Sequence, residues 1–232
     1  MAALISMQKV FLNGDFIDKD SAKISIFDRG FIFGDGIYEV VPVINGVIVE
    51  KQGFWDRFKR SLNEIDLSLP YSKDEFENIL NELIKINSLN EGGIYIQITR
   101  GIAQRDFSFV SGITPTVMAF AFSDSVLEHP GAKSGITIIS TPDIRWKRRD
   151  IKSISLLGQC YAKNQATIAG ADECFMVEDG YVTEAGSSSA FIIKDGALIT
   201  KPLSNEILPG IRRQRLLSLA KEIGLKIEER KF

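Results

Sequence analysis

The sequence predicts an α+β protein of two domains, and three features of its 232 residues lead to that prediction. Asn-Gly and Asp-Gly pairs stand between apolar runs at two places in each half of the chain, and such pairs are a strong short-range signal for a β-hairpin. Amphipathic helical spacing recurs in both halves. A polar segment separates them. We therefore expect a largely antiparallel sheet with packed helices in each domain.

The first half is expected to begin with strands and to continue with two helices. Apolar runs flank Asn13-Gly14 and Asn45-Gly46, which predicts a hairpin at each pair. Apolar residues then recur with helical spacing in 54–65 and in 76–84, and Ser72 and Glu75 form a capping box ahead of the second run. Strands are predicted at 94–99, which alternates, and at 116–122, which is continuously apolar. The two helices should cover one face of this sheet.

The polar segment 125–133 is interpreted as a linker between an N-terminal domain, 1–124, and a C-terminal domain, 134–232. Beyond the linker, a strand is predicted at 136–140 and a helix over 153–169, ending near Gly170. Hairpins are expected at Asp179-Gly180 and Asp195-Gly196. A last helix is expected over 211–223, ended by Gly224.

Charge and composition exclude several functional classes. Lysine and arginine total 28 against 30 acidic residues, a net charge of −2, so no nucleic-acid partner is expected. His129 is the single histidine, which argues against a histidine triad or a metal site. No apolar stretch is long enough to span a membrane, no secretory leader is evident, and Cys160 and Cys174 are too few for a disulfide framework. We expect a cytoplasmic protein with a small-molecule substrate.

Lys152 is a candidate for Schiff-base catalysis. It follows a predicted strand and the segment TPDIRWKRRD, whose cations together with apolar cover from Ile151 and Ile154 could lower the pKa of a lysine amine. The alternative from composition alone is a solvated basic loop, because most lysines are exposed.

Glu184 is a candidate partner for the nitrogen of a pyridine cofactor, which must stay protonated to accept electrons. It ends the run YVTE, and the following Gly186, Ser187 and Ser188 form a small polar turn that a flat ligand can approach. The alternative is a surface glutamate at a hairpin end.

A phosphate could bind where Leu208-Pro209-Gly210 opens into the predicted helix at Ile211 and Arg212, because helix N-termini bind anions. Arg57 lies off the apolar face of its helix and could reach the same phosphate, although an exposed arginine is an equally good interpretation.

Together these segments resemble the fold-type-IV pyridoxal-phosphate enzymes, most closely the D-amino acid aminotransferases. The resemblance is carried by FLNGDFI, DRGFIFGDGIYEVVPVING, YIQITRG, DIRWKRRDIKSISLLGQCYAKNQA, VTEAGSSSAF and LPGIRR. It implies two α+β domains with largely antiparallel or barrel-like sheets, a cofactor in the interdomain cleft, a homodimer, and ping-pong transfer of an amino group from a D-amino acid to a 2-oxo acid.

The resemblance also implies roles for individual residues. Lys152 matches the lysine that binds pyridoxal 5′-phosphate, and Glu184 matches the acid on the pyridine nitrogen. Tyr38 matches an active-site tyrosine, and Arg105 matches an arginine that binds the substrate carboxylate from the neighbouring subunit. The phosphate cup and cofactor contacts correspond to Arg57, Ser187, Ser188 and the amides of Ile211 and Arg212.

Three departures leave alternatives open. Phe107 stands where the resemblance leads us to expect a histidine in the carboxylate site, so larger donors or (R)-amines are conceivable substrates. Arg212 stands where family members often carry threonine. The sequence given ends at Phe232, whereas the family usually continues through a further strand-rich segment; either the gene product is truncated or this sequence is only the ordered part of it. The alternatives are an (R)-amine or branched-chain aminotransferase, an aminodeoxychorismate lyase of the same fold, and a truncated, inactive cofactor-binding dimer.

Overall fold

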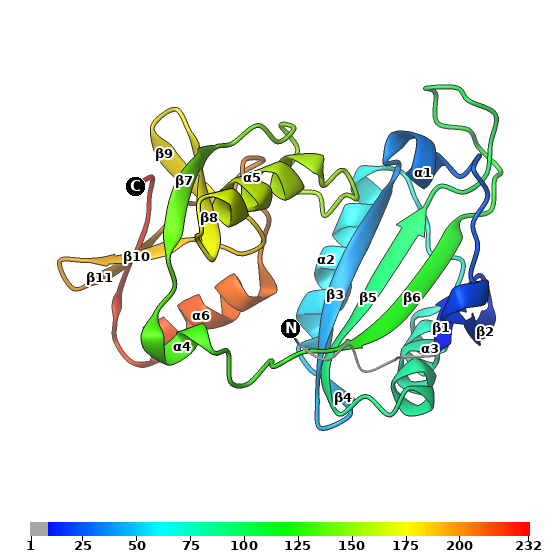
Figure 1. Ribbon diagram of the computed structural model, residues 1–232, viewed down its shortest axis with the longest axis horizontal. Coiled ribbons are helices and arrows are strands. Elements are labelled where there is room, and N and C mark those ends of the chain that lie inside the picture. Colours follow the sequence, from blue (N-terminus) through cyan, green and yellow to red (C-terminus); the bar gives the residue numbers. More distant parts are fainter. Residues whose placement is uncertain (1–8) are drawn as a thin grey trace. The chain divides into compact units, whose positions relative to one another are not determined.

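The computed structural model describes residues 9–232, which form two compact units (Figure 1). Of the residues described, the first unit contains 9–129 together with 152–154. The second contains 130–151 and 155–232. The division at His129–Pro130 falls inside the segment interpreted as a linker, whereas 152–154 pack with the first unit.

An antiparallel sheet forms the centre of the first unit, with the order β2-β1-β6-β5-β3-β4 in the described part of the chain. Its strands are β1 (Lys9–Leu12), β2 (Asp15–Asp18), β3 (Gly36–Ile44), β4 (Val47–Ile48), β5 (Glu91–Thr99) and β6 (Thr116–Ser123). The unit also contains η1 (Lys19–Ser21), α1 (Arg29–Phe33), α2 (Lys51–Glu64) and α3 (Lys73–Ile86). Both predicted hairpins and the Ser72–Glu75 capping box are confirmed.

Helices α2 and α3 cover one face of this sheet. Strand residues of one parity are buried there, such as Ile37, Val41 and Ile96, and they meet the aromatic side chains of the helices, where Phe58 stacks on Phe76 with ring centroids 6.0 Å apart. Residues of the other parity form an aromatic row across β3, β5 and β6 on the opposite face, made by Tyr38, Tyr95 and Phe120. Strand periodicity therefore gives the sheet two chemically different faces.

The second unit consists of two small sheets and three helices within the residues described. One sheet has the order β7-β8-β9 and the other β10-β11-β12. The strands are β7 (Ile138–Pro142), β8 (Glu173–Glu178), β9 (Tyr181–Ala185), β10 (Phe191–Lys194), β11 (Ala197–Thr200) and β12 (Lys226–Glu229), and the helices are α4 (Gly131–Ser134), α5 (Leu157–Ile168) and α6 (Ile211–Glu222).

Both predicted hairpins of this unit, β8–β9 and β10–β11, are confirmed. Each sheet also contains a parallel pair that the turn pattern did not predict, β7 with β8 and β11 with β12. Parallel neighbours need a long crossover, and α5 and α6 lie in those two connections. No helix within 9–232 is both long enough and apolar enough to cross a membrane.

The helix predicted over 153–169 begins later than expected. Ser153 forms an isolated bridge with Ile37 of β3, and α5 starts only at Leu157. Residues 153–156 are not helical, because Ser153 and Ile154 pair with β3 and not with a following helical turn. The predicted helix over 211–223 is confirmed as α6, and Gly224 follows it with a φ of 74°.

Candidate active site

The segment carrying Lys152 is attached to β3 of the first unit by main-chain hydrogen bonds. The Tyr38 amide donates to the Lys152 carbonyl at 2.9 Å, and the Ile154 amide donates to the Gly36 carbonyl at 3.1 Å. The Lys152 amide donates to Oγ of Ser61 on α2 at 3.3 Å. Gly36 is required here, because a Cβ would lie 2.4 Å from the Ile98 carbonyl oxygen. The backbone of Lys152 is therefore fixed by two elements of its own unit.

The Lys152 side chain lies against an aromatic ring. Its Nζ is 4.1 Å from the centre of the Tyr38 ring, and both residues are partly buried. Tyr38 in turn stacks on Tyr95 at 5.5 Å, and burial, together with Tyr38, raises the pKa of Tyr95 to about 12. The structure thus brings together two of the predicted site residues, an amine and the tyrosine that packs on it.

Arg57, on α2, forms an ion pair with a buried acid that the sequence analysis did not single out. Its Nε and Nη2 each donate to Glu39 of β3 at 2.7 Å. The Arg57 side chain is 10% exposed and the Glu39 side chain is fully buried. The interpretation of Arg57 as an exposed arginine is therefore wrong. A signal for the pair was present, because Glu39 occupies an inward position of β3 between Ile37 and Val41, where a carboxylate requires a partner.

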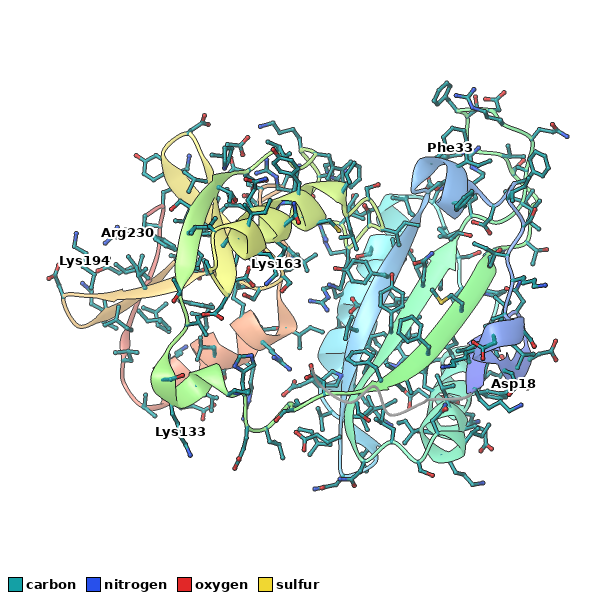
Figure 2. All side chains as sticks on the ribbon, in the orientation of Figure 1. Asp18, Phe33, Lys133, Lys163, Lys194 and Arg230 are labelled. Atoms are coloured by element: carbon teal, nitrogen blue, oxygen red, sulfur yellow. The ribbon has the colours of Figure 1, made fainter. Side chains whose placement is uncertain are left out.

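Arg105 and Phe107 lie in the loop between β5 and β6. Both are exposed, and the Arg105 guanidinium lies 5.2 Å from the Phe107 ring and 5.8 Å from that of Phe33. Phe33 is the last residue of α1 and is labelled in Figure 2. The loop is held at its base by Arg29, whose Nη1 donates to the Asp106 carbonyl at 2.5 Å and whose Nε donates to Asp35 at 2.7 Å. A buried ion pair therefore fixes the loop that presents Arg105.

In the second unit, Glu184 lies in β9 and both of its carboxylate oxygens are engaged. Oε2 accepts from Arg145 Nη1 at 2.6 Å, and Oε1 accepts from the Leu208 amide at 3.0 Å. The side chain is 8% exposed, so the interpretation of Glu184 as a surface glutamate is wrong. Burial raises its pKa, while Arg145 and the Leu208 amide oppose that rise.

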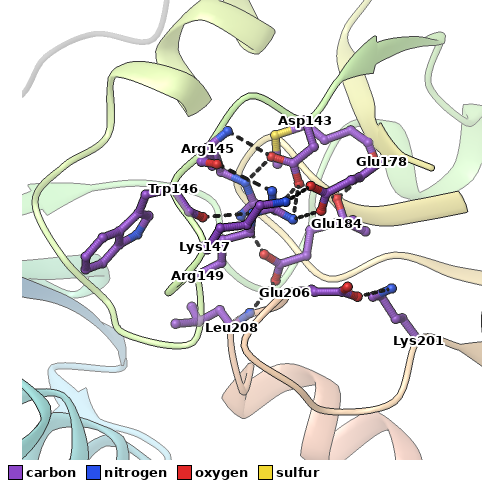
Figure 3. A network of polar contacts seen from close by, with 12 residues as sticks. Asp143, Arg145, Trp146, Lys147, Arg149, Glu178, Glu184, Lys201, Glu206 and Leu208 are labelled. Carbon is purple, nitrogen blue, oxygen red and sulfur yellow. Dashed lines mark hydrogen bonds and ion pairs between the residues drawn. The ribbon is translucent and has the colours of Figure 1, made fainter. Parts of the chain in front are cut away.

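The basic segment around Lys152 is largely neutralised, contrary to its interpretation as a source of positive charge. Figure 3 shows Arg145 and Arg149 directed at the carboxylates of Asp143, Glu178 and Glu184. Arg149 Nη1 lies 2.6 Å from Glu178 and 3.2 Å from Asp143, and Lys147 also pairs with Glu178. Donation from Arg149 and Lys147 lowers the pKa of Glu178 to about 2. Outside this group, Arg148 pairs with Asp150 at 3.0 Å.

Helix α6 begins at a turn suited to an anion. Its N-cap, Gly210, supplies no side-chain hydrogen bond, so the first-turn amides of Ile211 and Arg212 have no side-chain cap. A Cβ on Gly210 would lie 2.7 Å from Oγ of Ser189. The Arg212 side chain is exposed, as are Ser187 and Ser188 in the turn after β9. This arrangement offers main-chain donors and hydroxyls, which is a donor set that fits a phosphate.

The residues present fit a pyridine-aldehyde phosphate. In the first unit they are an amine against an aromatic ring and an arginine held by a carboxylate. In the second unit they are a buried carboxylate and an uncapped helix start. The fold and this chemistry define a class: a model of the amino-transferase class IV family matches residues 36–232, and the chain belongs to that family. The resemblance found in the sequence is confirmed, and the protein is an aminotransferase.

The chain is also similar to individual proteins over most of its length. The chain is 42% identical over 227 residues to the D-alanine aminotransferase of Staphylococcus haemolyticus, covering 97% of this chain and 80% of that protein. It is 38% identical over 222 residues to the D-alanine aminotransferase of Bacillus licheniformis, covering 96% and 78%. The crystal structure of the branched-chain amino acid aminotransferase of Escherichia coli superposes with a TM-score of 0.89 at 22% identity, covering 97% and 78%, which confirms the α+β fold.

Proposed function

We propose that this aminotransferase moves the amino group of a D-amino acid to a 2-oxo acid, with pyridoxal 5′-phosphate bound at Lys152. The observation that carries the proposal is the Lys152 amine, held 4.1 Å from the Tyr38 ring on a backbone fixed to β3 and α2. The identity of 42% to a D-alanine aminotransferase supports D-alanine or D-glutamate as donors and pyruvate or 2-oxoglutarate as acceptors.

Bound pyridoxal phosphate supplies an electrophilic carbonyl carbon and an electron-accepting ring. The chain's own residues then have separate tasks. With the cofactor bound, Lys152 Nζ would hold it and would move the proton of the substrate Cα, and the Tyr38 ring would limit the orientation of that amine. Glu184 would hold the proton of the ring nitrogen. Arg57 of the first unit and, in the second unit, the amides of Ile211 and Arg212 would serve as phosphate donors, with Ser187 and Ser188 as further polar contacts.

Arg105 binds the substrate carboxylate in this proposal, and it does so in the active site of a second copy of the chain. The exposed apolar side chains near Arg105 support such a homodimer, because large apolar residues gathered on a surface mark interfaces. They include Phe107, which is 76% exposed, Ile102 in the same loop, and Phe27, whose carbonyl accepts from the Ala103 amide. Phe107 beside Arg105 makes this carboxylate site more apolar than one with a second hydrogen-bond donor.

We also propose that the protein works in the cytoplasm. Cys160 and Cys174 are free thiols in the structure, which is the usual state of cysteine in a reducing compartment. Fractionation of the source cells tests this assignment, and recovery of the activity outside the cytoplasm would contradict it.

The substrate assignment is tested by adding single amino acids to the purified protein loaded with pyridoxal phosphate. We expect D-alanine to convert the absorbance band of the bound cofactor and release pyruvate, while L-alanine, L-leucine and an (R)-amine produce much slower changes. A fast response to L-leucine would favour a branched-chain enzyme, and a fast response to the amine would favour an (R)-amine enzyme. Pyruvate formed only from aminodeoxychorismate would favour a lyase.

A further inference from the structure

One guanidinium in the second unit bridges two buried carboxylates. Arg145 Nη1 donates to Glu184 at 2.6 Å, while its Nε and Nη2 donate to Asp143 at 3.0 and 2.8 Å (Figure 3). The three side chains are at most 8% exposed. Asp143 therefore contacts the Nε and Nη2 edge of the guanidinium, and Glu184 contacts Nη1.

The orientation of Arg145 is fixed by contacts other than Glu184. The guanidinium of Arg145 contacts Asp143 through two hydrogen bonds, and the Arg145 amide also donates to Asp143 at 3.1 Å. Asp143 is itself held by Oγ1 of Thr183 at 2.6 Å and by Arg149 at 3.2 Å. Gly158 of α5 leaves room for the Arg145 stem, because a Cβ at that position would lie 2.9 Å from Arg145 Cγ. Nη1 is therefore pre-oriented toward Glu184.

This arrangement determines the state of the Glu184 carboxylate. Burial favours its neutral form, and the opposing contacts are Arg145 and the Leu208 amide. Of these two, only Arg145 carries a full positive charge. A neutral carboxyl group would lose the negative charge that stabilises a protonated ring nitrogen.

We propose that Arg145, clamped by Asp143, is a positioning residue that fixes the carboxylate of Glu184 in the orientation and ionised state needed to hold the proton of the cofactor's ring nitrogen. The inference rests on the proposed function and deepens it. Arg145 acts through Glu184 and needs no contact with substrate or cofactor. Asp143 acts one step further away, through Arg145.

The test compares Arg145→Gln, Arg145→Lys and Asp143→Asn with a control, Arg148→Gln. Arg148 lies in the same segment and pairs with Asp150 instead. Each protein is loaded with pyridoxal phosphate labelled with ¹⁵N in its ring, and the ¹⁵N resonance of the bound cofactor is recorded beside kcat and KM for D-alanine. We expect the resonance to move toward that of the unprotonated ring in all three test variants and to stay in place in the control.

We also expect kcat to fall about 10- to 100-fold in Arg145→Gln, as for loss of a charged hydrogen bond, with KM changed much less. Asp143→Asn releases Arg145, but it also removes a negative charge that raises the pKa of Glu184, so both readouts should shift in the same direction by less. If Arg145→Gln does not fold by circular dichroism, the other two variants decide. An unchanged ¹⁵N resonance and kcat in Arg145→Lys and Asp143→Asn would overturn the inference. Failure of the unmodified protein to bind the labelled cofactor at all would instead contradict the proposed function.

Discussion

The carboxylate of Glu39 and the guanidinium of Arg57 form a bidentate pair inside the first unit, with both hydrogen bonds at 2.7 Å. Glu39 comes from the centre of β3 and Arg57 from α2, so the pair connects the sheet to its covering helix. The ion pair also orients the guanidinium of Arg57, which is the arginine predicted to bind the phosphate. Stability and cofactor binding should therefore both depend on this pair.

Glu39→Ala is expected to destabilise the first unit by about 3 kcal/mol, because removing one partner of a buried pair leaves the other charge uncompensated. Arg57→Ala should cost a similar amount, and the double variant should cost less than the sum, since the pair acts as a unit. Urea unfolding followed by Trp55 fluorescence, in a Trp146→Phe background, measures these values. Glu64→Ala on the same helix, whose pair with Arg60 is longer at 3.9 Å and more exposed, is the control and should cost at most about 1 kcal/mol. Additive losses would show that the two residues are not coupled.

Gly210→Ala is expected to weaken binding of pyridoxal phosphate about tenfold, the effect of losing one hydrogen bond. The added methyl group would lie 2.7 Å from Oγ of Ser189 and must displace the turn that opens α6. Equilibrium binding, followed by cofactor absorbance, measures the change. Ser189→Ala removes the clash, so the double variant should recover most of the affinity, whereas Ser189→Ala alone should bind nearly as the unmodified protein does. Unchanged affinity in Gly210→Ala would show that the start of α6 is not part of the phosphate site. A double variant as weak as Gly210→Ala would show that the loss does not come from the contact with Ser189.

Arg105→Ala is expected to raise KM for D-alanine about 10- to 100-fold, the cost of losing a charged hydrogen bond, and to leave KM for an (R)-amine nearly unchanged. Phe107→His should lower KM for D-alanine by adding a donor beside Arg105, while Val110→His, an exposed position in the same loop, should have little effect. Steady-state kinetics with the two donor classes measures both outcomes. Equal losses for donors with and without a carboxylate would rule out Arg105 as the carboxylate-binding residue.

Mixing two inactive variants tests whether Arg105 acts across a dimer. Lys152→Ala and Arg105→Ala should each be nearly inactive with D-alanine at low concentration. If Arg105 serves the neighbouring subunit, a mixed dimer contains one site with both residues intact, so unfolding and refolding the mixture should restore part of the activity. No recovery, with mixed dimers present by mass spectrometry, would show that Arg105 acts within its own chain.

Glu178→Gln is expected to reduce stability at neutral pH and to have progressively less effect in acid. The pKa of Glu178 lies at about 2 in the folded protein and ordinarily at 4.5, so its ionised form stabilises the fold above pH 4.5. That contribution declines as the pH falls through the window from 4.5 to about 2. Thermal unfolding at pH 7, 5 and 3 measures the difference from the unmodified protein. Glu222→Gln, at an exposed position of α6, is the control. A difference that grows on acidification would contradict this assignment.

The sequence predicted those parts of the fold that local chemistry determines. Asn13, Asn45, Asp179 and Asp195 all adopt a positive φ followed by glycine, which is why each hairpin could be placed from four or five residues. The Ser72 capping box is equally local. The parallel strand pairs were missed because their partners are separated by a helix and a long connection.

The candidate site was predicted as residue types and not as contacts. Lys152, Glu184 and Arg57 were found through their motifs, but the partners of the last two, Arg145 and Glu39, depend on pairing between distant segments. Arg145 was interpreted as a source of positive charge. Its guanidinium is in fact shared by Asp143, 2 residues away in the sequence, and Glu184, 39 residues away. Only the folded arrangement of β9 and the segment after β7 reveals the pairing of Arg145 with Glu184.

Reduction of the cofactor-loaded protein with borohydride, followed by proteolysis and mass spectrometry, tests the assignment of Lys152 most directly. We expect one phosphopyridoxyl group per chain, on the peptide containing Lys152, and none in Lys152→Ala treated in the same way. Labelling of a different lysine in the unmodified protein, or undiminished labelling of Lys152→Ala, would contradict it.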